Sequence, residues 1–293
     1  MRLGEFERAW GESDRVSGGP AALPSGRILI RCCRGLGDAI QFLRYAPGLK
    51  RHGDSVAVQG PLRLLPLLKH MRGIDRAIPL EEAIDAREYD SEIECSDLPY
   101  VFRTTLETIP REMPYIFLPQ SRIELRRREL GPAGGRLKIG IAWAAGAWNP
   151  VRSIPPVYLE PLARIPGIAL FSLKRGADVN DLWQSPLLAG IPHGERPEGN
   201  IDDTAATITG LDLVISVDTM VAHLAGALNR PVWVLLQHTA DWRWMLRRSD
   251  TPWYPSMRLF RQPSPGDWAG AVQEVCEELS KFAGYARLPA ASD

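Results

Sequence analysis

The sequence predicts an α/β protein built from two units with parallel sheets that face each other across a cleft. Short apolar runs recur along the chain, and most are followed by small or polar residues and then by a helical pattern. This alternation begins twice, first near residue 27 and again near residue 137. Strands and helices that alternate at this spacing are typical of parallel sheets with right-handed crossovers.

Composition limits the function classes that the chain can have. Its 293 residues suffice for two domains, and 45% hydrophobic with 24% charged residues is typical of a globular protein. The formal net charge of zero argues against broad electrostatic binding to nucleic acid or to an anionic membrane. We expect a cytoplasmic protein, because the chain has neither a membrane-length apolar run nor the apolar core of a signal peptide. The four cysteines have the spacing of neither a disulfide framework nor a zinc site: Cys32, Cys33, Cys95 and Cys276.

The first unit opens with the apolar run Arg27–Arg31, which leads into the turn Gly35-Leu36-Gly37-Asp38. The residues after this turn place Ile40, Leu43 and Ala46 on one side of a helix, so we expect a helix with a single buried stripe. The unit's other expected elements are strands at Ser55–Gln59, 76–78 and 91–93 and a helix over 62–70.

Asp38 is a carboxylate at the point where the first strand of this unit turns into a helix. That point lies at the edge of the sheet where small molecules bind in parallel α/β proteins. The glycines beside it allow a sharp turn and leave room for a ligand. Asp38 either complements the positive end of the helix or takes part in catalysis, and the segment by itself supports both interpretations.

The second unit follows a charged run at Glu124–Leu130 and a glycine-rich linker. We interpret the charged run as a solvated surface helix rather than a phosphate site, because glutamates alternate with its arginines. The segment from Asp267 to Phe282 has apolar residues at steps of four and three, which predicts an amphipathic helix. The strands expected in this unit are Leu137–Trp143, Ile168–Leu173, Leu211–Val217, Val232–Leu236 and Met257–Phe260.

A second candidate site lies after the strand Leu211–Val217. Asp218 and Thr219 precede a helix there, and the amides of Met220 and Val221 with the helix dipole could bind an anion such as a diphosphate. His223, one turn further on, could add a hydrogen bond or a positive charge. The alternative interpretation is an N-cap made by Asp218 or Thr219, with His223 as a half-buried side chain.

Cations follow other strands of the second unit at the same sheet edge. Arg152 and Ser153 come after Trp143, and Lys174 comes directly after Leu173. Cations that converge on one edge could neutralise a diphosphate without a metal, and no Asp-x-Asp pair gives a reason to expect a divalent cation.

Two further segments are more readily explained by packing and capping. The aromatic residues of 241–244 and 252–255 could stack on a sugar, but we favour a packing role for them. Residues 200–204 resemble a helix cap, and a ribose or phosphate contact from Asp203 or Thr204 is the second possibility.

Together these segments resemble one family in their order. The resemblance covers 27–282 and points to the heptosyltransferase-like glycosyltransferases of family nine, in the branch often fused to tetratricopeptide repeats. The opening residues 3–10 are similar to the end of such a repeat, although one helix cannot form an array. The segments that carry the resemblance are 35–45, 152–155, 172–176, 203–206, 217–228, 241–244, 252–255 and 259–262.

The resemblance implies a GT-B fold, in which two Rossmann-like domains face a cleft and a C-terminal helix crosses back. It implies a repeat-like segment at 1–26, an acceptor domain at 27–135, a nucleotide-sugar domain at 136–265 and the bridging helix with its tail at 266–293. The reaction would be inverting, with no cofactor or metal, from an ADP-, UDP-, GDP- or TDP-sugar to a hydroxyl of a glycan, lipid-linked or protein acceptor.

The resemblance also assigns roles to residues. Asp38 matches the catalytic base, and Gly35, Gly37 and Gln41 would lie on the acceptor side. Asp218, Thr219 and His223 match the donor-binding motif. The other residues expected at the donor are Arg152, Ser153, Lys174, Asp203, Thr204, Met220 and Val221.

Two other functions are weighed against transfer. The chain departs from the usual family pattern at 32–34, 143–146 and 237–239, which keeps a non-catalytic module that binds a sugar nucleotide or a partner as an alternative. A nicotinamide-dependent oxidoreductase is disfavoured, because Ile40 stands where the dinucleotide fingerprint has its third glycine.

Overall fold

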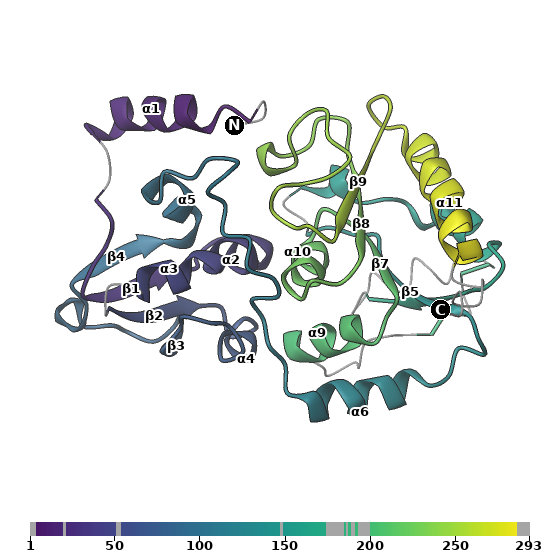
Figure 1. Cartoon of the computed structure of the whole chain (residues 1–293), viewed down its shortest axis with the longest axis horizontal. Coiled ribbons are helices and arrows are strands. Elements are labelled where there is room, and N and C mark those ends of the chain that lie inside the picture. The colour runs from purple at the N-terminus through teal and green to yellow at the C-terminus, as the bar shows by residue number, and fades with distance from the viewer. Residues whose placement is uncertain are drawn as a thin grey trace, which may run out of the picture.

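The computed structural model describes residues 4–19, 22–50, 54–146, 149–173, 185, 187–188, 191–192 and 200–285. The chain forms two α/β halves that lie side by side, each around its own parallel sheet (Figure 1). This arrangement is the two-unit fold that the sequence predicts.

The first sheet contains four parallel strands in the order β3-β2-β1-β4. Because β2 and β3 lie on one side of β1 and β4 on the other, the strand order reverses between β1 and β4. In open α/β sheets the carboxyl ends of the strands at such a reversal form a crevice where ligands bind. The strands are β1 (Arg27–Arg31), β2 (Ser55–Gly60), β3 (Arg76–Pro79) and β4 (Ser91–Glu94).

The helix after β1, α2 (Leu36–Phe42), is more deeply buried than the sequence predicts. All of residues 39–46 are buried, and not only the stripe of Ile40, Leu43 and Ala46. The reason is that α2 also packs against α10 (Met220–Ala227) of the other half. The remaining helices of this half are η1 (Leu43–Tyr45), α3 (Ala46–Lys50), α4 (Leu65–Leu68), η2 (Ala86–Glu88), η3 (Cys95–Asp97) and α5 (Leu98–Val101).

The second sheet contains five parallel strands in the order β6-β5-β7-β8-β9, so its order reverses between β5 and β7. All residues of β7 and β8 are buried, as expected of strands covered on both faces. The strands are β5 (Leu137–Ala142), β6 (Ile168–Ser172), β7 (Leu213–Val217), β8 (Val232–Leu236) and β9 (Met257–Arg261). Besides α10, the helices described in the second half are η4 (Pro150–Arg152), η5 (Pro156–Leu159), α7 (Glu160–Ala163), α9 (Ile201–Thr209), η7 (Trp242–Trp244) and α11 (Trp268–Tyr285).

Helix α6 (Gln120–Leu130) is not the fully solvated helix that the sequence predicts. It packs on α9, and the buried Arg126 donates hydrogen bonds to Thr207 Oγ1 at 2.7 and 3.1 Å. Because α6 packs on the second half, we propose that the chain passes between the halves near Pro119 and not near Gly135.

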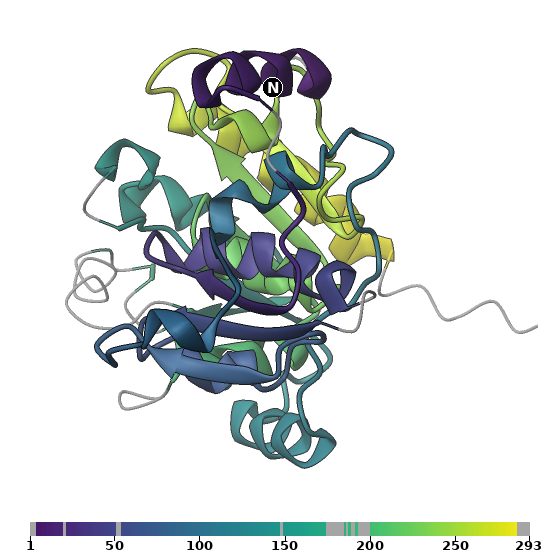
Figure 2. The ribbon, with the colours of Figure 1, turned by 90° about the vertical axis from the view of Figure 1, so that its left-hand side faces the viewer.

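The helix that bridges the two halves is the N-terminal one, and not the C-terminal one that the resemblance implies. Helix α11 does not cross back, because its apolar face packs into a core whose described residues all belong to the second half. Helix α1 (Phe6–Ser17) instead lies over the first half with its N-terminal end toward the second (Figures 1 and 2). The Phe6 ring contacts Trp242 and Trp253, and Trp10 Nε1 donates to Thr104 O at 2.6 Å.

An aromatic core joins the two halves, which agrees with a packing role for most of 241–244 and 252–255. Phe42 stacks on Trp242 with ring centroids 6.3 Å apart, and Trp244, Trp253 and Tyr254 are buried. Helix α1, helix α2 and the loops after β8 therefore share one continuous core. Among the described residues, no helix has the length and apolar character needed to span a membrane.

Candidate active site

A cavity of 1650 Å³ lies between the two halves. Its walls include the loops after β1 and β4 in one half and those after β5 and β7 in the other, and α1 and the segments after β2 and β8 also contribute. The loops after β1, β4, β5 and β7 lie at the carboxyl ends of the strands where each sheet reverses its order, so both sheets present their binding edges to one space. Asp38 and the start of α10 both line this cavity, as the sequence predicts.

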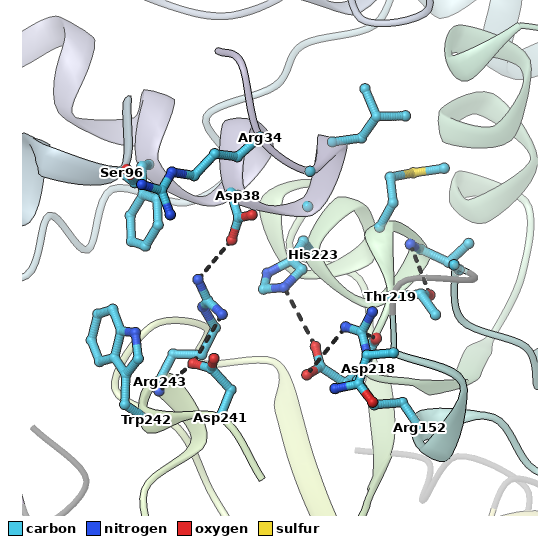
Figure 3. A pocket seen from close by; sticks show the side chains of 18 of the residues that line it. Arg34, Asp38, Ser96, Arg152, Asp218, Thr219, His223, Asp241, Trp242 and Arg243 are labelled. Atoms are coloured by element: carbon cyan, nitrogen blue, oxygen red, sulfur yellow. Dashed lines mark hydrogen bonds and ion pairs between the residues drawn. The ribbon is translucent and has the colours of Figure 1, made fainter. Parts of the chain in front are cut away.

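Asp38 enters the cavity from the first turn of α2 and meets an arginine of the opposite half (Figure 3). Arg243 Nη2 donates to Asp38 Oδ1 at 2.7 Å. The same guanidinium lies 2.9 Å from Asp241 Oδ1 and packs over the rings of Phe42 and Trp242. A direct ion pair therefore crosses the cleft between the two halves.

The N-terminus of α10 forms the opposite wall of the cavity. Thr219 caps the helix, since its hydroxyl accepts a hydrogen bond from Val221 N at 3.3 Å. The capping interpretation is thus confirmed, yet Thr219, Met220 and Val221 also line the cavity. A helix N-terminus with amides facing a cavity favours a bound anion.

Asp218 lies directly before this helix and is almost completely buried. Arg152 Nη1 donates to its backbone oxygen at 2.9 Å and lies 3.7 Å from its Oδ2. Burial raises the pKa of the Asp218 carboxyl, which the nearby Arg243 and Arg152 oppose. Asp218 thus holds Arg152 beside the helix N-terminus, chiefly through its backbone oxygen, and a cation there would complement an anionic ligand.

His223 is held rigidly, and of the two roles considered for it, a hydrogen bond or a positive charge, its surroundings favour the hydrogen bond. Its ring stacks on Trp244 with centroids 5.3 Å apart, and its Nδ1 lies 3.0 Å from the Tyr254 hydroxyl. Burial, with added repulsion from Arg243, Arg44 and Arg152, lowers the pKa of the imidazole well below its ordinary value. His223 can therefore contribute a neutral hydrogen-bonding edge at the wall of the cavity.

The stability of the protein should fall as the pH drops below about 6.5, the ordinary pKa of histidine. In that range the unfolded chain binds a proton at His223 that the folded protein does not, so the free energy of unfolding falls by up to about 1.4 kcal/mol per pH unit. Urea unfolding near pH 7.5 and near pH 5.5 measures this slope of the free energy of unfolding against pH. His223→Gln should reduce it, whereas His238→Gln, at an exposed histidine, should not. Equal slopes in wild type and His223→Gln would contradict this assignment.

The glycines of the Gly35-Leu36-Gly37-Asp38 turn lie at the cavity, but Gln41 does not. A Cβ on Gly37 would lie 2.8 Å from His223 Cδ2, so only glycine allows α2 to approach α10 this closely. Gln41 lies one turn further along the same face of α2 and is fully buried. The expected place of Gln41 at the acceptor is therefore wrong, because that face of α2 is covered by the other half.

The expected donor residues divide into those that reach the cavity and those that support its loops. Arg152 and Thr204 line the cavity. Ser153 does not line it, and its hydroxyl accepts from Ala145 N at 2.9 Å. Asp203 forms a capping box with Asn200 and binds Arg122, so the capping interpretation holds for it. Lys174 lies outside the described residues.

Arg243 is the cavity residue that the sequence prediction missed. It stands between two tryptophans after β8, and the aromatic residues directed attention to packing. The sequence signal that could have found Arg243 is the one used for Arg152: both are cations that follow a strand at the binding edge of the sheet. Within the described part of the chain, no three histidine, cysteine, aspartate or glutamate side chains are grouped as metal ligands would be.

Two parallel α/β units around one cleft form the GT-B fold of glycosyltransferases, and solved structures confirm this likeness. The chain superposes on ADP-heptose lipopolysaccharide heptosyltransferase II of E. coli with a TM-score of 0.63 at 16% identity, covering 88% of this chain and 99% of that one. A family 9 glycosyltransferase from Veillonella parvula gives a TM-score of 0.63 at 13% identity, covering 91% of this chain and 98% of that one.

Sequence comparison gives a more specific likeness for the second half. Residues 196–265, which contain α9, β7, α10, β8 and β9, match the family described as Glycosyltransferase family 9 (heptosyltransferase). This match supports a glycosyltransferase. The chain is also 26% identical over 288 residues to Protein FlbA of Caulobacter vibrioides, covering 88% of this chain and 47% of that protein. The chain thus spans about half the length of this relative.

Proposed function

We propose that this protein is an inverting, metal-independent glycosyltransferase that moves a sugar from a nucleotide-activated donor to an acceptor hydroxyl. One observation carries the proposal: a carboxylate of the first half and a capped helix N-terminus of the second half line one cavity. The family match over residues 196–265 supports it, since that segment contains the proposed donor site.

The donor diphosphate would bind at the start of α10. The Met220 amide, the Thr219 hydroxyl and the positive end of the helix dipole would face the diphosphate there, and Arg152 supplies positive charge. These groups can stabilise the charge that develops on the leaving diphosphate, which is the task that a divalent cation performs in other transferases. His223 adds a neutral hydrogen-bonding group beside them.

Asp38 would act as the general base. It removes the proton from the acceptor hydroxyl as that oxygen attacks the anomeric carbon, on the face opposite the diphosphate. The bond from the anomeric carbon to the phosphate oxygen breaks, and the nucleoside diphosphate leaves with the electron pair. A single displacement of this kind inverts the configuration at the anomeric carbon.

Binding of nucleoside diphosphates tests the donor site. We expect at least one of ADP, UDP, GDP and TDP to raise the melting temperature in the presence of EDTA, because selective binding stabilises the folded state. ADP is the first choice, since the E. coli structural neighbour is named for ADP-heptose. Thr219→Val should weaken binding about tenfold through loss of one hydrogen bond to a charged group. Wild-type protein that binds none of the four would contradict the proposed function.

A further inference from the structure

We propose that Arg243 is a positioning residue that couples donor binding to the release of Asp38. This inference rests on the proposed function. The Asp38 carboxylate and the donor diphosphate would compete for one guanidinium, so Asp38 becomes available to an acceptor hydroxyl only when the donor takes Arg243. The donor would then bind before the acceptor can react.

The ion pair occupies the part of Asp38 that an acceptor would need. Arg243 approaches from the opposite half and binds Oδ1 at 2.7 Å. The other oxygen, Oδ2, lies beside the turn, since a Cβ on Gly35 would be 3.1 Å from it. The oxygen that faces the opposite half is thus the one bonded to the guanidinium (Figure 3).

Two arginines at the interface differ in their partners, and of the two it is Arg243 whose partners are carboxylates that a diphosphate could replace. Arg44 is buried and donates to two backbone oxygens, of Trp253 at 2.6 Å and of Gln41 at 2.8 Å. Such bonds fix Arg44 in place. The side chain of Arg243 instead binds the carboxylates of Asp38 and Asp241, and its buried Nε has no hydrogen-bond partner in the described part of the chain.

The proposed donor site is within electrostatic reach of Arg243. Its positive charge acts on both Asp218 and His223, the residues at the start of α10. Figure 3 shows its side chain between Asp38 and Asp241, with His223 and Asp218 to the right of it. A diphosphate at the helix N-terminus brings more negative charge than the single carboxylate of Asp38, so it would compete effectively for the guanidinium.

The competition predicts that removing the base tightens binding of the leaving group. Asp38→Asn should lower the Kd of the best-bound nucleoside diphosphate about tenfold, which corresponds to about 1.4 kcal/mol. The gain should vanish when Arg243 is absent, so Asp38→Asn should have no effect in an Arg243→Gln background. Calorimetry on the four proteins of this double-mutant cycle measures the coupling directly.

Matched variants separate this coupling from the general effect of charge. Asp97→Asn removes one negative charge from the same cavity without contact to Arg243, and it should change Kd much less than Asp38→Asn. Arg243→Lys keeps a cation and should restore part of the coupling. Arg243→Ala serves as a second background if the glutamine variant unfolds, with folding checked by thermal denaturation.

The outcomes distinguish the two proposals. Tighter binding in Asp38→Asn that depends on Arg243 supports the coupling. Unchanged binding, or an equal gain with and without Arg243, overturns the coupling but leaves the donor site intact. Failure of the wild-type protein to bind any nucleoside diphosphate overturns the proposed function, and the coupling with it.

Discussion

Asp38→Asn is expected to lower the rate of sugar transfer about 10²–10⁴-fold, the usual contribution of a general base. An amide cannot take a proton from the acceptor hydroxyl, while its size and shape keep the turn before α2 unchanged. The nucleoside diphosphate should still bind, and it should bind more tightly because Asp38 no longer competes with it for Arg243. The measurement is kcat with saturating donor, together with Kd for the nucleoside diphosphate by calorimetry.

The control for this prediction is Asp250→Asn. It removes the same charge from an exposed ion pair with Arg248, outside the residues that line the cavity. We expect its transfer rate to equal that of wild type. An Asp38→Asn protein that transfers sugar at the wild-type rate would remove Asp38 from the mechanism, whatever its effect on binding.

The sheets could be predicted from the sequence because their signal is local. Most of the strands are apolar runs of five or six residues, such as β7, and short runs buried on both faces are recognisable without knowledge of the partner strands. The sheet edges that carry Asp38 and Thr219 follow from the same runs. The strand order then places both residues at the reversal points, where a shared cavity forms.

The contacts between the halves could not be predicted in this way. Helix α2 shows one apolar stripe in its sequence, yet the other half covers its remaining faces, including Gln41. The Asp38–Arg243 pair joins residues 205 positions apart. Each of the two has an ordinary local explanation, Asp38 as a negative charge near the positive end of a helix and Arg243 as a loop cation. Only the relative position of the two units shows that these side chains meet.

The positions of the two terminal helices could not be predicted for the same reason. Helix α11 has the amphipathic pattern of any helix that covers a sheet, and this pattern does not say which sheet. Helix α1 shows two aromatic residues in a polar segment, Phe6 and Trp10, both of which are buried. Their partners, Trp242 and Trp253 for Phe6 and Thr104 for Trp10, lie far along the chain in both halves.

Gly37→Ala is expected to destabilise the protein by about 1–3 kcal/mol, the usual cost of extra volume in a packed interior. The new methyl group would lie 2.8 Å from His223 Cδ2. The imidazole cannot move away easily, because Trp244 stacks on it and the Tyr254 hydroxyl binds its Nδ1. The variant should also transfer sugar more slowly, since α2 must shift and carries Asp38 with it. Urea unfolding and kcat measure the two effects.

Gly11→Ala is the matched control. It makes the same chemical change in a helix, but it is expected to raise the stability of the protein and not to lower it. Gly11 lies in α1, and apart from the neighbouring backbone of α1 itself, no atom of the described residues lies within 4 Å of the position that its Cβ would take. Alanine there should stabilise the protein by about 0.5–1 kcal/mol, since glycine is the poorer helix former. Gly37 would gain the same preference, so a loss of stability in Gly37→Ala measures the collision with His223. If both variants were equally stabilised, the close approach of α2 to α10 would not be the reason for glycine at this turn.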